Sequence, residues 1–210
     1  MTPESQGEAF RGQFEIQKTT GSELSIDTRY NSVKDGVLYS EISRTGFLFS
    51  NSLFNQFDLV WSHTASANSM IGGKFQFLGG SRVSKETGHK LALAALIGSN
   101  DYETDDGVVK YKLGGQEFLL LYGYRFMEQI MSYSSLSQAT YNFNGVVHSS
   151  GALDGQRPNI DSRVLSLSGG IEGSVDPVFA KLEFTYQNIK SDKTKDYTHF
   201  VTGLSLGISW

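Results

Sequence analysis

The last twelve residues of the chain alternate between large apolar and small side chains with a period of two. One face carries Phe200, Thr202, Leu204, Leu206, Ile208 and Trp210, and the other carries His199, Val201, Gly203, Ser205, Gly207 and Ser209. Successive side chains of an extended strand point to opposite sides, whereas a helix repeats about every 3.6 residues. The segment therefore predicts a β-strand with one continuous apolar face.

The same alternation recurs toward the N-terminus, and almost no sustained helical period interrupts it. Apolar faces of this kind run through residues 178–187, 164–172, 117–126, 133–143, 91–97, 71–77 and 53–61, with weaker ones at 37–49, 24–30 and 10–16. In the segment 133–143 the apolar face is expected to consist of Tyr133, Ala139, Tyr141 and Phe143. These segments predict about ten strands, with twelve as the alternative and eight less favoured.

The connections between these segments alternate in length. Residues 127–129 and 175–177 form tight turns, whereas residues 99–107, 147–161 and 189–196 are long, polar and charged. Short turns at one end and long loops at the other are typical of an up-and-down antiparallel barrel. No linker or repeat divides the chain, so residues 1–210 are expected to form one barrel domain. For residues 1–20 the sequence leaves three alternatives, which are an extra strand, a periplasmic extension and a partial plug.

Three features of the last strand favour lipid over a protein core as the environment of its apolar face. Its other face, from residue 201 onward, carries no charge, which suits a narrow crowded lumen better than a solvated surface. Ten steps of about 3.3 Å, tilted by about 40°, span roughly 25 Å, which is the height of a lipid-facing band. Aromatic residues mark both ends of the face, as interfacial girdles require. The all-β class is therefore predicted as a transmembrane β-barrel.

The ending formed by Phe200, Leu204, Leu206, Ile208 and Trp210 resembles the C-terminal signature of bacterial outer-membrane β-barrel proteins. In that family the signature ends on an aromatic residue, more usually Phe than Trp. The resemblance implies a location in the bacterial outer membrane and recognition by the barrel assembly machinery. It also implies contact with membrane lipids or lipopolysaccharide.

Composition excludes several other classes. The 210 residues include no Cys, which rules out disulfides, a Cys-based zinc site and a Cys nucleophile. A formal net charge of −4 argues against a nucleic-acid partner. No run of 18 to 20 apolar residues suggests a transmembrane helix, and the first residues lack the basic and apolar regions of a signal peptide. No cofactor and no metal are expected.

Barrel width grows with strand number, and about eight strands leave an interior that side chains fill. Ten strands therefore predict a narrow, largely filled lumen. The polar residues expected to face it are Glu117, Arg125, Glu172, Lys181, Glu183, Thr185, Gln187 and His199. They carry both charge signs, which predicts an ion-paired interior. The leading expectation is a non-enzymatic outer-membrane protein that acts through lipid or partner contacts of its external loops. A small selective pore is the alternative. The pattern leaves a homo-oligomer as a further option.

A lipid-modifying enzyme is the third hypothesis. The pair His148 and Ser150 is similar to the His-x-Ser arrangement of lipid A 3-O-deacylases, but Gly151 stands where that family has Asn. The pair His63 and Ser66 has the wrong parity for one strand face. Asp101, Glu103, Asp105 and Asp106 form an acidic loop without the spacing of a calcium site. No catalytic residue is therefore assigned.

Overall fold

The computed structural model describes residues 1–26, 37–64, 69–103, 109–147, 159–192 and 196–210. Within them the chain forms ten β-strands and no helix. Their bounds are β1 Gly12–Ile26, β2 Val37–Phe54, β3 Phe57–Thr64, β4 Ser69–Leu78, β5 Gly88–Glu103, β6 Val109–Met127, β7 Ile130–Val147, β8 Asn159–Val175, β9 Val178–Ser191 and β10 Tyr197–Ser209.

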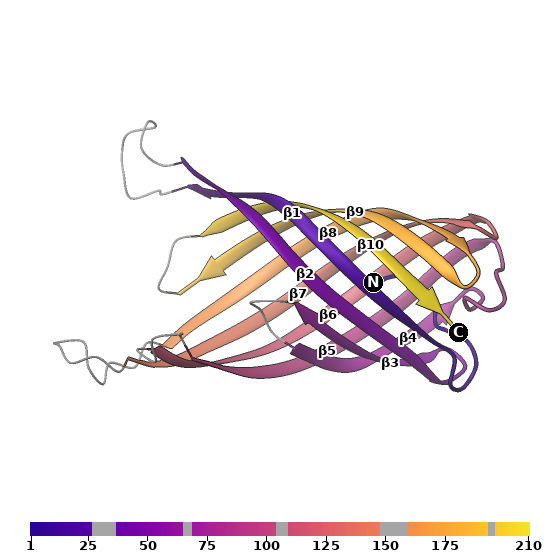
Figure 1. Ribbon diagram of the computed structural model, residues 1–210, viewed down its shortest axis with the longest axis horizontal. Helices are drawn as coiled ribbons and strands as arrows, with labels where there is room; N and C mark the ends of the chain where they lie inside the picture. Colours follow the sequence, from indigo (N-terminus) through magenta and orange to yellow (C-terminus); the bar gives the residue numbers. More distant parts are fainter. Residues whose placement is uncertain (27–36, 65–68, 104–108, 148–158, 193–195) are drawn as a thin grey trace.

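Each strand pairs antiparallel with the next one along the chain, and β1 pairs with β10 to close the barrel (Figure 1). The closing ladder runs from Gln13 opposite Ser209 to Ser25 opposite Tyr197. The predicted all-β, up-and-down antiparallel barrel of about ten strands is confirmed. No helix among the described residues is long and apolar enough to cross a membrane.

The tight connections gather at one end of the barrel, which we call the short-turn end. Two residues join β2 to β3, β6 to β7 and β8 to β9, while residues 79–87 join β4 to β5. The C-terminal strand also ends there (Figure 1). The left-handed conformations that these turns need fall at Gln56, Gly79 and Lys85, with φ of 72°, 86° and 51°.

The strands differ widely in length. β6 has 19 residues and β7 has 18, whereas β3 has 8 and β4 has 10. A tilted strand of about 9–11 residues crosses a bilayer, so the long strands extend well beyond the lipid-facing band at the end opposite the turns. Asp101 and Glu103 accordingly lie in β5 instead of in the expected loop, and Asp105 and Asp106 lie outside the described residues.

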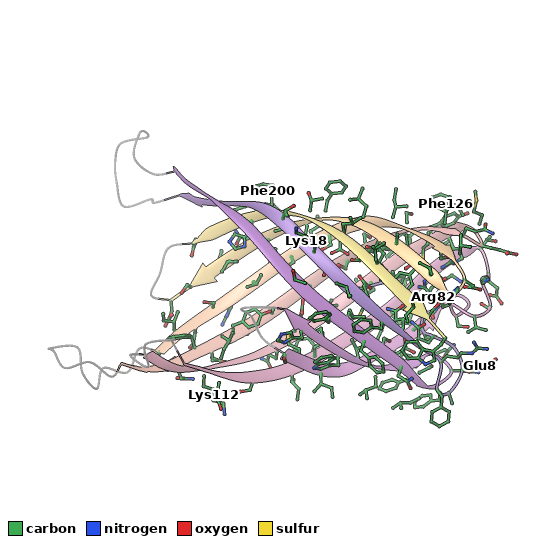
Figure 2. All side chains as sticks on the ribbon, in the orientation of Figure 1. Glu8, Lys18, Arg82, Lys112, Phe126 and Phe200 are labelled. Atoms are coloured by element: carbon green, nitrogen blue, oxygen red, sulfur yellow. The ribbon has the colours of Figure 1, made fainter. Side chains whose placement is uncertain are left out.

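The outer wall follows the predicted alternation on most strands. Phe184 of β9, Leu167 of β8 and Phe118 of β6 are more than half exposed, while their sequence neighbours point inward. On β10, the outward residues include Phe200, Leu204, Leu206 and Ile208, and Trp210 directly after the strand is also exposed. Figure 2 shows Phe200 and Phe126 projecting away from the barrel.

Strand β7 is the exception, and its predicted face was wrong. Tyr133 and Ala139 are buried in the lumen, with only 4% and 3% of their surfaces exposed, and Tyr141 and Phe143 share that inward parity. The outward face is instead Ser132, Ser134, Leu136, Gln138 and Thr140. Tyr133 fits inside because a glycine faces it across the ladder: a Cβ on Gly170 would lie 2.8 Å from the tyrosine ring.

Candidate functional site

The first six residues of the chain lie inside the barrel at its short-turn end, and we call them the plug segment. Thr2, Glu4 and Ser5 have no exposed surface, and Gln6 is also buried. The chain leaves the lumen at Glu8, which is exposed, and then enters β1. A polar segment buried in this way must find hydrogen-bond partners on the wall.

The wall contacts the main chain of the plug segment. The Ser5 amide donates to Gln76 Oε1 of β4 over 2.6 Å, and the Ser5 carbonyl accepts from the Arg82 amide over 2.8 Å. The Gln6 amide donates to Asp58 Oδ1 of β3 over 3.1 Å. These contacts hold the backbone whatever the side chains of the segment are.

Lys74 of β4 connects this backbone to the wall. Its ammonium donates to the carbonyl oxygen of Thr2 over 3.3 Å and to that of Glu4. The same ammonium lies 3.0 Å from Asp58 Oδ2, and both side chains are fully buried. A buried ammonium needs this combination of a counter-charge and hydrogen-bond acceptors.

The Glu4 carboxylate is the one acidic group of the plug segment. Arg125 of β6 binds both of its oxygens, with Nε 2.8 Å from Oε1 and Nη2 2.6 Å from Oε2. The Lys90 ammonium of β5 lies 3.7 Å from Oε1. We call Arg125, Lys90 and Lys74 the Glu4 cradle. A two-pronged guanidinium–carboxylate pair is among the strongest and most directional charged hydrogen bonds.

A second group of charges continues from the cradle across the wall. Glu172 of β8 lies 2.9 Å from Arg82 Nη2 and 3.8 Å from both Arg125 and Lys181. Lys181 of β9 also pairs with Glu15 of β1. Together with the Glu4 cradle and Asp58, the ionic network takes side chains from seven strands and from the residue 79–87 loop. These side chains are almost entirely buried.

The Phe179 ring lies beneath two of these cations. The Arg82 guanidinium is 4.5 Å from its centroid and the Lys181 ammonium is 4.8 Å away. A cation over an aromatic face is stabilised more strongly when it is desolvated. Gly207 of β10 makes room for the ring, because a Cβ there would overlap it.

The charges of this region do not balance on the wall alone. Lys74, Arg82, Lys90, Arg125 and Lys181 face the wall carboxylates Glu15, Asp58 and Glu172. These five cations meet the three carboxylates and a fourth, Glu183 of β9, which is 15% exposed and lies 3.9 Å from the Met1 ammonium. The plug segment adds that ammonium and the Glu4 carboxylate. An uncompensated buried charge is costly, so the described wall favours an anionic group where Glu4 lies.

Apolar side chains surround the plug segment beyond the cradle. Val60, Met70 and Leu96 form one buried cluster, and Ala92, Ala94 and Leu121 form another. Met1 packs against both clusters. On the side of β3 to β6, buried hydrocarbon therefore lies next to the ionic network.

The structure brings three of the polar residues expected in the lumen into one network: Arg125, Glu172 and Lys181. Thr185 lies apart from them, where its hydroxyl donates to Glu183 over 3.3 Å and is 2.8 Å from Ser168 Oγ. The remaining members of that set are half-buried Glu117 and Gln187 and buried His199.

Sequence reasoning missed the other half of the network. Lys74 and Gln76 alternate with Phe75 and Phe77, so a period-two reading of 71–77 places both of them inward. Asp58 could have been found in the same way from its apolar neighbours. Glu4 carries no such signal, because it belongs to a short segment without alternation.

The histidine and serine candidates fall in different places. His148 and Ser150 lie outside the described residues. His63 of β3 faces Ser69 of β4 across the ladder, with Nδ1 2.7 Å from Oγ. Both are half-buried at the end of the shortest hairpin, where the His63 ring stacks with Trp61. In the described part of the chain, no three His, Asp or Glu side chains gather as metal ligands do.

No protein-family model matches the sequence, and no curated protein matches it. Solved structures do match. The outer-membrane protease OmpT from Escherichia coli has a TM-score of 0.51 at 11% sequence identity, over 95% of this chain and 97% of that one. Ail of Yersinia pestis, bound to the heparin analogue sucrose octasulfate, has a TM-score of 0.45 at 11% identity, over 96% and 99% of the two chains. Neisserial surface protein A has 0.35 at 14% identity, over 94% and 97%.

The likeness to OmpT, together with the closed ladder of ten strands, shows the fold of the bacterial outer-membrane β-barrels. At 11% identity it carries the fold alone.

Proposed function

We propose that the protein is a non-enzymatic integral protein of the bacterial outer membrane whose lumen is closed by its own N-terminal segment. The observation that carries this proposal is the burial of Thr2, Glu4, Ser5 and Gln6 inside the barrel. Its outer wall meets lipid, and its long-loop end meets lipopolysaccharide or a partner.

The membrane location is supported by the chemistry of the outer wall. Leu204, Leu206 and Ile208 of β10 are at least half exposed, and so are Leu165, Leu167 and Ile171 of β8. Such a belt of apolar side chains around most of a barrel would be unstable in water. In a bilayer the same side chains meet hydrocarbon, and the closed ladder leaves no strand edge unpaired in lipid.

The groups that fill the lumen favour a closed barrel over a pore. The plug segment and the ionic network occupy the short-turn end, and the apolar clusters around Met1 lie beside them. Ions crossing this barrel would have to displace paired charges and a hydrogen-bonded backbone. We therefore favour a structural or partner-binding protein over a small solute channel.

Planar-bilayer recording of the full-length protein tests this proposal. The wild-type barrel is expected to insert without producing steady, reproducible current steps. Insertion is checked independently by a heat-modifiable gel shift of the protein recovered from the same vesicles. Regular unit steps from the wild-type protein would overturn the closed-lumen proposal.

A hydrolase of membrane lipids is the second candidate, and the pair of His63 and Ser69 favours it. Their 2.7 Å contact has the geometry of a base next to a hydroxyl nucleophile. Ser69→Ala removes that hydroxyl, and Ser135→Ala, on an inward position of β7, is the matched control. Release of fatty acid from phospholipid or lipopolysaccharide vesicles that Ser69→Ala alone abolishes would establish the hydrolase and refute the non-enzymatic proposal.

A further inference from the structure

The plug segment is bound by the wall as a peptide ligand is bound by a receptor. Its backbone is held by Gln76, Asp58, Lys74 and the Arg82 amide, which would hold any extended peptide in the same way. Main-chain hydrogen bonds give affinity in such sites, and pockets for particular side chains give specificity.

Specificity in this site comes from one side chain of the segment. The Glu4 carboxylate receives both prongs of Arg125 and the charge of Lys90, and neither cation has more than 1% of its surface exposed. Pro3 packs closely over Gly123, where a Cβ would lie 2.8 Å from the proline ring. The other side-chain groups of the segment contribute little, since Thr2 Oγ1, Ser5 Oγ and Gln6 Nε2 have no hydrogen-bond partner.

We propose that the short-turn end of the lumen is a binding site for an extended peptide bearing one carboxylate, which the plug segment fills in cis and can leave. This inference rests on the proposed closed lumen and adds that the closure is a displaceable peptide–receptor contact. The ligand class is an extended acidic peptide, because the wall holds the peptide backbone and places two cations, Arg125 and Lys90, at its one carboxylate. Departure of the segment opens the barrel from the short-turn end.

The energetic reason is the charge imbalance of the wall. Without Glu4, the five buried wall cations face four wall carboxylates, and Arg125 loses its two short carboxylate contacts. This leaves the Glu4 cradle attractive to another anion. A lysine at position 4 would place a further cation beside Arg125 and Lys90. Reversal of this one charge is therefore expected to expel the segment while the strands stay paired.

The test uses full-length variants in planar bilayers. Glu4→Lys is expected to produce unit current steps that the wild-type protein lacks. Glu8→Lys makes the same charge change on an exposed residue outside the lumen, which is ion-paired with Arg11 over 3.6 Å, and is expected to stay silent. Combining Glu4→Lys with Arg125→Glu restores an opposite-charge pair and is expected to close the barrel again.

A peptide added in trans tests the ligand class. Acetyl-Thr-Pro-Glu-Ser-Gln-amide, added on the short-turn side, is expected to block the Glu4→Lys current. The same peptide with Gln in place of Glu should bind roughly ten- to a hundredfold more weakly, because a hydrogen bond to a charged group is worth about 1.5–3 kcal/mol. Equal block by both peptides would overturn the carboxylate site.

The outcomes separate this inference from the proposed function. A conducting wild-type protein would refute the closed lumen itself. A silent wild type with a silent Glu4→Lys variant, both folded by the heat-modifiable gel shift, would overturn the displaceable plug and leave the closed lumen standing. If Glu4→Lys does not fold, the milder Glu4→Gln is recorded instead, and unit steps are again the expected result.

Discussion

Arg125 joins the plug segment to the wall through more partners than a single ion pair supplies. Its guanidinium donates to both carboxylate oxygens of Glu4 and to the Glu128 carbonyl, the latter over 2.6 Å, and lies 3.8 Å from Glu172. In a buried network, loss of one member leaves its partners charged and unpaired. Arg125 is therefore expected to contribute both to the stability of the barrel and to the closure of the lumen.

Truncation of this side chain is expected to destabilise the barrel strongly. Arg125→Ala should lower the free energy of unfolding by about 3–5 kcal/mol, because Glu4 loses its main partner in a buried site. Arg125→Lys keeps the charge but not the two-pronged geometry, so it should cost less. Urea unfolding in lipid vesicles measures both. Arg163→Ala, at an exposed position of β8, is the control, and an equal loss there would contradict the role given to the network.

Gly207 offers a second test at single-residue resolution. A Cβ there would overlap the Phe179 ring and lie 2.6 Å from the Phe14 carbonyl oxygen. Gly207→Ala should therefore destabilise the barrel by roughly 1–3 kcal/mol, as overpacking does. Gly173→Ala places its methyl group in open space and should change stability by less than about 0.5 kcal/mol. The same unfolding assay compares the two, and indistinguishable losses would show that the ring moves away freely.

At the scale of the strand, alternation predicts the strands and the barrel well. It predicts less well which face of a strand points toward lipid. In β10 the large residues point outward because lipid accepts them, and small buried residues such as Gly203 and Ser205 point inward. In β7 the rule inverts, because Tyr133 finds space over Gly170 and the outward positions are mainly Ser, Gln and Thr. Which face meets lipid depends on what the neighbouring strands leave free, and a single strand does not contain that information.

A charge placed on the outer wall tests the lipid contact of a strand. Leu204→Arg puts a cation near the middle of the apolar band of β10 and should cost about 2–4 kcal/mol. Asn144→Arg, at an exposed outward position of β7 toward the long-loop end, should cost roughly 0–1 kcal/mol. Unfolding titrations in vesicles measure both, and equal costs would mean that β10 does not face hydrocarbon.

At the scale of the whole molecule, the ring of ten paired strands has no free edge, and we therefore expect the barrel to resist detergent. The folded protein is expected to run faster than the boiled protein on a sodium dodecyl sulfate gel and to need detergent or lipid for solubility. A protein that is fully soluble and monomeric without detergent would contradict the membrane barrel.

The candidate site was less predictable than the barrel around it. Arg125, Glu172 and Lys181 were expected in the lumen from strand parity, since each alternates with apolar neighbours. The pairing of Arg125 with Glu4 was not predictable, because a short polar segment carries no periodicity that reveals where it folds. Only the closed barrel brings residues 4 and 125 within hydrogen-bond distance.

Labelling of a single cysteine tests closure by the plug segment most directly, because the chain has no native Cys. Ser5→Cys changes a buried hydroxyl that has no hydrogen-bond partner, and Glu8→Cys lies just outside the lumen. With a membrane-impermeant maleimide applied to the short-turn side of the reconstituted full-length protein, residue 8 should label rapidly and residue 5 far more slowly, at a rate that rises on denaturation. Labelling of residue 5 as fast as residue 8 would contradict a barrel closed by its own N-terminal segment.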